Sequence, residues 1–105
     1  MNIPKIIADE LNVKIWQVEK TIELIDDGNT IPFISRYRKE VTGSLNDEQL
    51  RNLDERLTYL RNLDEKKTQV LATIDEQGKL TEELKKQIED AMTMVAVEDL
   101  YRPYR

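Results

Sequence analysis

One stretch of the sequence decides the fold: DEQLRNLDERLTYLRNLDEKKTQVLATIDEQ, residues 47–77. It contains neither glycine nor proline, the two residues that most often interrupt a helix. Its apolar residues follow a helical stripe, at Leu50, Leu53, Leu57, Leu60, Leu63, Val70, Leu71 and Ile74. This period predicts one amphipathic helix, about 46 Å long at 1.5 Å per residue. The polar stretch at residues 64–69 weakens the stripe and marks either a bend or a solvated middle.

Both ends of this helix carry local signals. Asn46 followed by Gln49 predicts a capping box, in which each side chain accepts a hydrogen bond from the backbone N–H of the other residue. Gly78 is a good terminating residue because glycine adopts the left-handed conformation that ends many helices. We therefore expect the helix to begin at Asp47 and to end at Gln77.

The residues after Gly78 predict a helix that returns along the long one. Thr81 is its expected cap, and its buried stripe is expected to comprise Leu84, Ile88, Ala91 and Met92. The short link makes an antiparallel hairpin the natural arrangement. Residues 95–101 predict one last short helix before Pro103, and the abrupt ending suggests a chain cut from a larger multidomain protein.

The residues before the long helix predict short helices. Apolar stripes at residues 3–11 and 15–25, with Asn12 between them, give a helix-turn-helix-like outline, and Thr30 is the expected cap of a third helix. The apolar face of that third helix is expected to comprise Phe33, Ile34 and Tyr37. The prediction is an all-α, multihelical fold with a short-helix module over residues 1–45 and a long helix with its antiparallel return helix over residues 46–105.

Composition excludes several kinds of chemistry. The chain has no cysteine, hence no disulfide or thiolate metal site, and no histidine, the side chain best suited to proton transfer near neutral pH. No apolar run approaches the ~20 residues that span a bilayer, and no signal peptide pattern is present. We expect a cytoplasmic, non-enzymatic protein with no cofactor, no metal and no membrane contact.

Charge singles out one segment. The net charge is −5, which opposes phosphate, but residues 31–45 contain three basic residues and one acidic residue. The three basic residues, Arg36, Arg38 and Lys39, are the candidate nucleic-acid-binding residues, because guanidinium groups pair well with phosphate oxygens and Tyr37 could stack on a base. The competing interpretation is that internal salt bridges hold these cations to the long helix.

Two further interpretations concern partners. The helix-turn-helix outline suggests DNA reading by Lys14, Gln17, Lys20 and Thr21, but the acidic residues around it favour a purely structural module. Trp16 is expected to pack against the helix that carries Phe33 rather than to serve as a ligand platform. The leucine stripe of the long helix would allow self-association, although packing within the chain comes first.

Three stretches carry a resemblance to a known family. They are IPFISRYRKE at residues 31–40 with Thr42 and Gly43, LTYLR at residues 57–61, and EDLYRPY at residues 98–104, with EQGKLT at residues 76–81 between the last two. In this order they resemble the N-terminal region of the Tex family of transcription accessory proteins, and the match covers essentially the whole chain.

The resemblance implies a much larger parent protein. Such a parent has a helical N-terminal region, a nuclease-like domain usually read as inactive, helix-hairpin-helix elements, and a C-terminal OB-fold domain that binds RNA. The expected role of this chain is then a scaffold that positions the RNA- or DNA-binding domains of the parent. The alternatives are a protein-interaction module that docks onto transcription or ribosome machinery, and an autonomous helix-turn-helix DNA-binding module.

Overall fold

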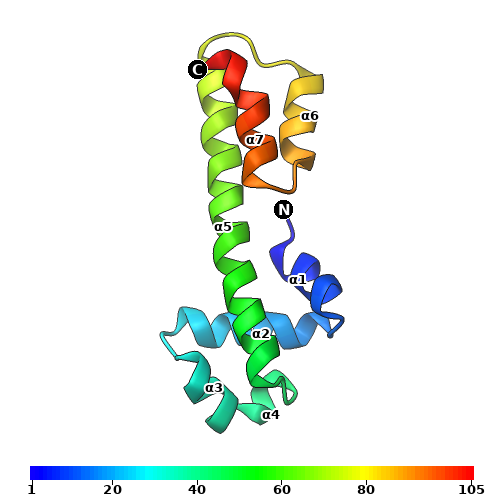
Figure 1. The fold of residues 1–105 in the computed structure, drawn as a ribbon, viewed down its shortest axis with the longest axis vertical. Coiled ribbons are helices and arrows are strands. Elements are labelled where there is room, and N and C mark those ends of the chain that lie inside the picture. The colour runs from blue at the N-terminus through cyan, green and yellow to red at the C-terminus, as the bar shows by residue number, and fades with distance from the viewer. The chain divides into compact units, whose positions relative to one another are not determined.

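The computed structural model describes all 105 residues and contains helices and no strand (Figure 1). The elements are α1 (Ile3–Leu11), α2 (Ile15–Asp26), α3 (Ile31–Tyr37), α4 (Lys39–Thr42), α5 (Asp47–Glu76), α6 (Glu82–Asp90), α7 (Met94–Tyr101) and the 3-10 helix η1 (Arg102–Tyr104). The predicted all-α, multihelical fold is confirmed. None of these helices combines the length and the apolar character that a membrane crossing requires.

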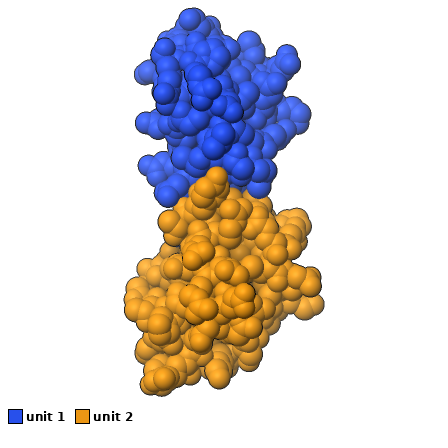
Figure 2. All heavy atoms as spheres, viewed as in Figure 1, with its two compact units in different colours: residues 1, 61–105 blue, residues 2–60 orange.

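The chain divides into two compact units, which Figure 2 colours separately. The N-terminal unit comprises residues 2–60, and the C-terminal unit comprises residues 61–105 together with Met1. Helix α5 contributes residues to both units. The domain division expected from the sequence, residues 1–45 and 46–105, stays a prediction.

Helix α5 runs without interruption from Asp47 to Glu76, as the sequence predicts. Its capping box is confirmed: the Asn46 N–H donates to Gln49 Oε1 at 2.9 Å, and the Gln49 N–H donates to Asn46 Oδ1 at 2.8 Å. The polar stretch at residues 64–69 causes no break. Within it Lys67 is buried, and its Nζ donates to the carbonyl oxygen of Glu89 at 2.6 Å. Burial lowers the pKa of Lys67, and the nearby acidic groups, Asp64 first, oppose that shift.

The N-terminal unit is built on an apolar core drawn from α1, α2, α3, the link between α4 and α5, and the first half of α5. Its buried apolar residues are Ile7, Ala8, Val18, Ile34, Leu45, Leu50, Leu53, Leu57 and Leu60. Helices α1 and α2 meet through Asn12, which adopts the left-handed conformation expected of a turn asparagine, at φ 55°. Thr30 caps α3 as predicted, since its hydroxyl accepts from the Phe33 N–H at 3.3 Å.

An ion pair joins α1 to α5 within this unit. The Arg56 guanidinium donates to both carboxylate oxygens of Glu10, at 2.7 Å and 2.8 Å. These charge-assisted hydrogen bonds raise the pKa of Arg56. The fork geometry gives the contact direction as well as energy, so it fixes α1 against the long helix.

The C-terminal unit confirms the antiparallel return helix. Thr81 caps α6 by accepting from the Leu84 N–H at 3.1 Å, and Lys67 of α5 contacts Glu89 near the far end of α6. The core comprises Leu63, Val70, Ile74, Leu84, Ile88 and Val97. The expectation for Met92 is wrong: α6 ends at Asp90, so Met92 falls in the following link, where its side chain is 47% exposed.

Glu98 links α5 and α7 in the C-terminal unit. Its carboxylate accepts from Lys66 Nζ at 2.7 Å and pairs with Arg105, and the contact with Lys66 is the main reason that its pKa lies below the ordinary value of 4.5. A depressed pKa means that the ionised form stabilises the folded state above the unfolded pKa, and that this stabilisation is lost as the pH falls through the folded pKa. Glu98→Gln is therefore expected to lower the melting temperature at neutral pH and to flatten its decline below pH 4.5. Thermal unfolding across acidic pH tests this, and parallel curves for the two proteins would contradict it.

Candidate nucleic-acid interface

The candidate interface is built on α3 and the start of α4. Pro32 occupies the first turn of α3, where its missing N–H costs no hydrogen bond, and Ile34 is fully buried and holds the helix to the core. Seven residues after α3 begins, Arg38 leaves helical geometry at φ −130° and ψ 31°, and α4 starts with Lys39. The three candidate cations therefore lie at the end of one short helix, in the link, and at the start of the next helix.

None of the three candidate cations forms an ion pair in the structure. Arg36 and Lys39 are exposed. Arg38 is partly buried, and its guanidinium donates to the backbone oxygen of Tyr37 at 2.9 Å and lies 5.0 Å from the centre of the Phe33 ring. The interpretation that salt bridges tie these cations to the long helix is therefore wrong.

Two aromatic rings lie beside these cations. Phe33 is 36% exposed and Tyr37 is 54% exposed, with ring centres 5.1 Å apart and planes tilted by 49°. Of the three residues expected to form the apolar face of α3, only Ile34 is buried. Phe33 and Tyr37 are four positions apart and share one side of the helix, whereas Ile34 is turned about 100° from Phe33 toward the core.

A hollow of about 420 Å³ opens at these rings. Its lining comprises Pro32, Phe33, Ser35, Arg36, Tyr37 and Asp47. Of the three candidate cations, only Arg36 borders it. The sequence indicates Tyr37 as a candidate but not Phe33, Ser35 or Asp47, and the i to i+4 spacing of the two rings is the one signal for Phe33.

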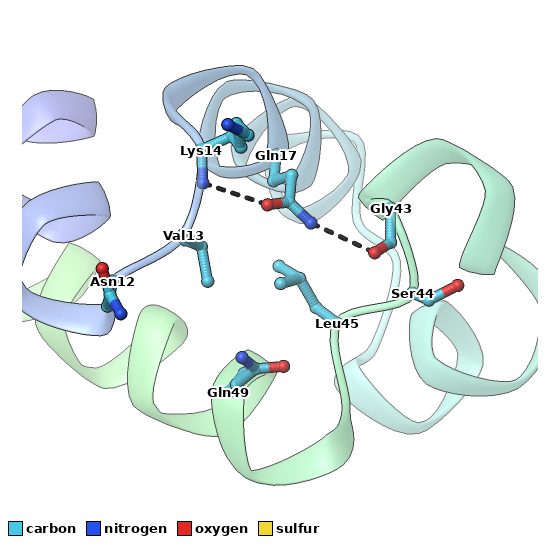
Figure 3. Close-up of a pocket in the computed structure, with 8 residues that line it drawn as sticks. All are labelled: Asn12, Val13, Lys14, Gln17, Gly43, Ser44, Leu45 and Gln49. Carbon is cyan, nitrogen blue, oxygen red and sulfur yellow. Dashed lines mark hydrogen bonds between the residues drawn. The ribbon is translucent and has the colours of Figure 1, made fainter.

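A second hollow, of about 430 Å³, lies between the α1–α2 turn and the α4–α5 link (Figure 3). Gln17 reaches across it from α2: its Oε1 accepts from the Lys14 N–H at 3.0 Å, and its Nε2 donates to the carbonyl oxygens of Thr42 at 3.0 Å and Gly43 at 3.1 Å. These bonds satisfy backbone groups at two helix ends. The role of Gln17 in this hollow is therefore structural.

The same contacts weaken the DNA-reading interpretation. Of the four side chains expected to face a major groove, Gln17 is committed to the contacts above, and Thr21 is fully buried with its hydroxyl donating to the Gln17 carbonyl at 2.7 Å. Lys20 pairs with Glu23 at 3.4 Å. A recognition helix needs side chains free to reach base edges, and α2 lacks most of them.

Trp16 lies beside Gly43, the residue that ends α4, and its expected contact with the helix of Phe33 stays a prediction. The far end of the Trp16 ring would lie 2.7 Å from a Cβ built on Gly43, so the ring packs over that glycine, although 47% of it stays exposed. The leucines of α5 are covered within the chain, from Leu50 to Leu63. No group of three or more acidic side chains gathers in a way that would hold a metal ion.

These observations define a small all-helical protein with exposed cations and aromatic rings on α3 and at the start of α4. The chain belongs to the family described as the Tex-like protein N-terminal domain, whose sequence pattern matches residues 1–75. It is 56% identical over all 105 residues to the Transcriptional accessory protein Tex of Neisseria gonorrhoeae, and 50% identical over 99 residues to the Protein tex of Bordetella pertussis. It is also 33% identical over 101 residues to the human S1 RNA-binding domain-containing protein 1.

The relatives are much longer than this chain. The matched region is all of the chain and 14% of the Neisseria protein, 94% of the chain and 12% of the Bordetella protein, and 96% of the chain and 10% of the human protein. The chain is thus the N-terminal domain of a transcription accessory protein family that includes S1 RNA-binding relatives. These relatives are named for transcription and for RNA binding, not for an enzymatic activity.

Proposed function

We propose that this chain is the non-catalytic helical scaffold of a cytoplasmic, RNA-binding transcription accessory factor, and that Arg36, Arg38 and Lys39 contribute contacts to the RNA backbone. The scaffold positions the nucleic-acid-binding domains of the longer protein. The single observation that carries the backbone contact is the absence of any ion pair on these three cations.

The distribution of charge supports this assignment. Elsewhere basic side chains are repeatedly neutralised by acidic neighbours, as in the pairs of Lys5 with Asp9, Lys86 with Asp90 and Arg102 with Asp99. Residues 31–45 have a net positive charge within a chain of net charge −5. A cation without a partner gives up no internal ion pair when it binds a phosphate, and residues 36–39 bring three such cations close together in the sequence.

The helical framework supports the scaffold role. Helix α5 is continuous over 30 residues and is tied to α1 by the Arg56 fork and to α6 by buried Lys67. Within its own unit, each of these contacts holds a neighbouring helix to α5. The choice of RNA as the ligand is supported by the names of two relatives, which are both called S1 RNA-binding domain-containing protein 1.

The backbone contact is tested with the double variant Arg36→Gln/Lys39→Gln. Binding to a labelled single-stranded RNA of about ten nucleotides, followed by fluorescence anisotropy at about 50 mM salt, should weaken about tenfold. The dependence of log affinity on log salt should become shallower by about 0.7 for each phosphate that the variant no longer neutralises.

The matched control is Lys79→Gln/Lys85→Gln, which removes the same charge from two exposed lysines that also lack an ion pair. This control should bind nearly as wild type does. If both double variants weaken binding equally, the effect is one of net charge alone and the assignment to α3 fails.

A protein-docking role is the second candidate, and exposed apolar side chains on α2 favour it. Ile15 is 42% exposed and its neighbour Trp16 is 47% exposed. Deleting residues 1–105 from the longer protein separates the two roles: a large loss of RNA affinity assigns binding to this domain, and an unchanged affinity leaves it with architecture or docking.

A further inference from the structure

We propose that Phe33 and Tyr37 form a stacking platform for the bases of single-stranded RNA, beside Arg36 as the phosphate contact. This inference rests on the proposed RNA contact and adds two things to it: the residues that hold the bases, and a preference for single strands over duplexes.

The two rings are arranged as a pair at the hollow. They lie on the same side of α3 with centres 5.1 Å apart, and both border the hollow. Arg38 lies over the Phe33 ring, and its guanidinium donates a hydrogen bond to the Tyr37 carbonyl. This contact restricts the movement of the Phe33 ring on the side where Arg38 lies. Rings already fixed by the fold lose little conformational freedom when a base stacks on them.

Both rings are exposed to solvent. Ile34 is the only buried residue of the seven in α3, and Phe33 and Tyr37 are exposed. The two rings therefore do not contribute the hydrophobic free energy that burial would give. Scattered exposed apolar residues are ordinary, but here two exposed rings lie next to each other at the rim of one hollow. Their planes are tilted by 49°, so each ring offers its own apolar face, on which the flat π-face of a nucleobase can stack.

Charge complementarity selects the occupant. Arg36 borders the hollow without an ion pair, and Lys39 lies three residues further along, also without one. An apolar protein segment would leave these cations without partners, whereas a nucleotide offers a base for the rings and a phosphate for the cations. Asp47, which also borders the hollow, is an acceptor for a base amino group or a ribose 2′-hydroxyl.

The platform requires an unpaired strand. In a duplex the bases are stacked on one another and their faces are not available, so a duplex presents only its backbone to this surface. In a single strand the bases can turn outward and stack on aromatic side chains. Single-stranded DNA shares these features, and only contacts to the 2′-hydroxyl would separate it from RNA.

The test is the variant Phe33→Leu/Tyr37→Leu in the 105-residue chain. Leucine keeps an apolar side chain but removes the π-face. Affinity for single-stranded RNA should fall about tenfold or more at every salt concentration, with the salt slope unchanged. In NMR spectra of the wild-type chain, the ring protons of both residues should shift when RNA is added. Affinity for a duplex of the same sequence should be weaker than for the single strand and insensitive to the variant.

Two further variants of the chain distinguish loss of base stacking from other causes of weaker binding. Trp16→Leu removes another exposed ring, one that does not border this hollow, and should leave affinity nearly unchanged. The melting temperature of each variant shows whether it is folded. Arg36→Gln/Lys39→Gln reports the backbone contact separately, through the salt slope.

Three results would overturn the platform. If Phe33→Leu/Tyr37→Leu binds as wild type does while the cation variant weakens, stacking fails and the backbone contact stands. If neither variant changes RNA binding, the proposed function fails with it. If sedimentation shows a dimer that the leucine variant abolishes, a second copy of the chain covers the rings instead.

Discussion

Gly43→Ala is expected to lower the free energy of unfolding of the N-terminal unit by about 2–4 kcal/mol. Gly43 has φ +69°, a conformation that costs an L-residue about 1 kcal/mol or more. A Cβ there would lie 2.6 Å from Gln17 Nε2 and 2.7 Å from Trp16 Cη2. Gln17 would have to withdraw and give up its bonds to Thr42 and Gly43, at about 1 kcal/mol each. Urea unfolding followed by Trp16 fluorescence measures the loss, since Trp16 is the chain's single tryptophan.

Two other glycines separate strain from crowding. Gly28 and Gly78 also have positive φ, at +95° and +71°, but a Cβ at either would meet no atom within 4 Å. Alanine at these positions should cost only the strain, about 1 kcal/mol. A Gly43→Ala cost no larger than theirs would contradict the close packing around Gln17. The cost should also shrink in a Gln17→Ala background, because the substitution then displaces one side chain fewer.

The parts of the fold that follow local rules were predictable from the sequence. The capping box of Asn46 and Gln49, the caps Thr30 and Thr81, and the left-handed Asn12 each depend on a few neighbouring residues, and each is confirmed. The 30-residue continuity of α5 agrees with the absence of glycine and proline from residues 47–76. Local propensity and period agree along this stretch, so tertiary contacts have nothing to override.

The parts that depend on side-chain direction were not predictable. The acidic residues near Arg36 in the sequence suggested salt bridges, but none of them reaches the three cations. Phe33 and Ile34 are adjacent apolar residues, and only the packing of α3 against the unit decides that Ile34 is the buried one. Gln17 and Thr21 are candidate DNA contacts from the sequence alone. In the structure, Gln17 is occupied by its hydrogen bond to Thr42, and Thr21 is buried in the core. Nothing in the sequence indicates either of these tertiary placements.

Ile34→Ala is expected to lower the free energy of unfolding of the N-terminal unit by about 2–5 kcal/mol. Ile34 is fully buried, so its truncation removes apolar packing and leaves a cavity. Ile34→Val should cost about 0.5–1.5 kcal/mol, in proportion to the smaller volume removed. Ile15→Ala is the matched control: the same substitution at a side chain that is 42% exposed should cost less than about 1 kcal/mol. Urea unfolding monitored by Trp16 fluorescence gives all three values.

The same substitution links stability to the proposed RNA site. Helix α3 has seven residues, well below the ~12–15 at which an isolated helix becomes even marginally stable, so its order depends on its contact with the core. Ile34 is the only buried residue of α3, and loosening it should free Phe33, Tyr37 and Arg36 from their fixed arrangement. Ile34→Ala should therefore weaken RNA binding even at temperatures where the rest of the unit stays folded, with α3 amides exchanging faster than those of α5. Unchanged stability would refute the burial of Ile34, whereas unchanged RNA affinity alongside fast exchange in α3 would show that the site does not require an ordered helix.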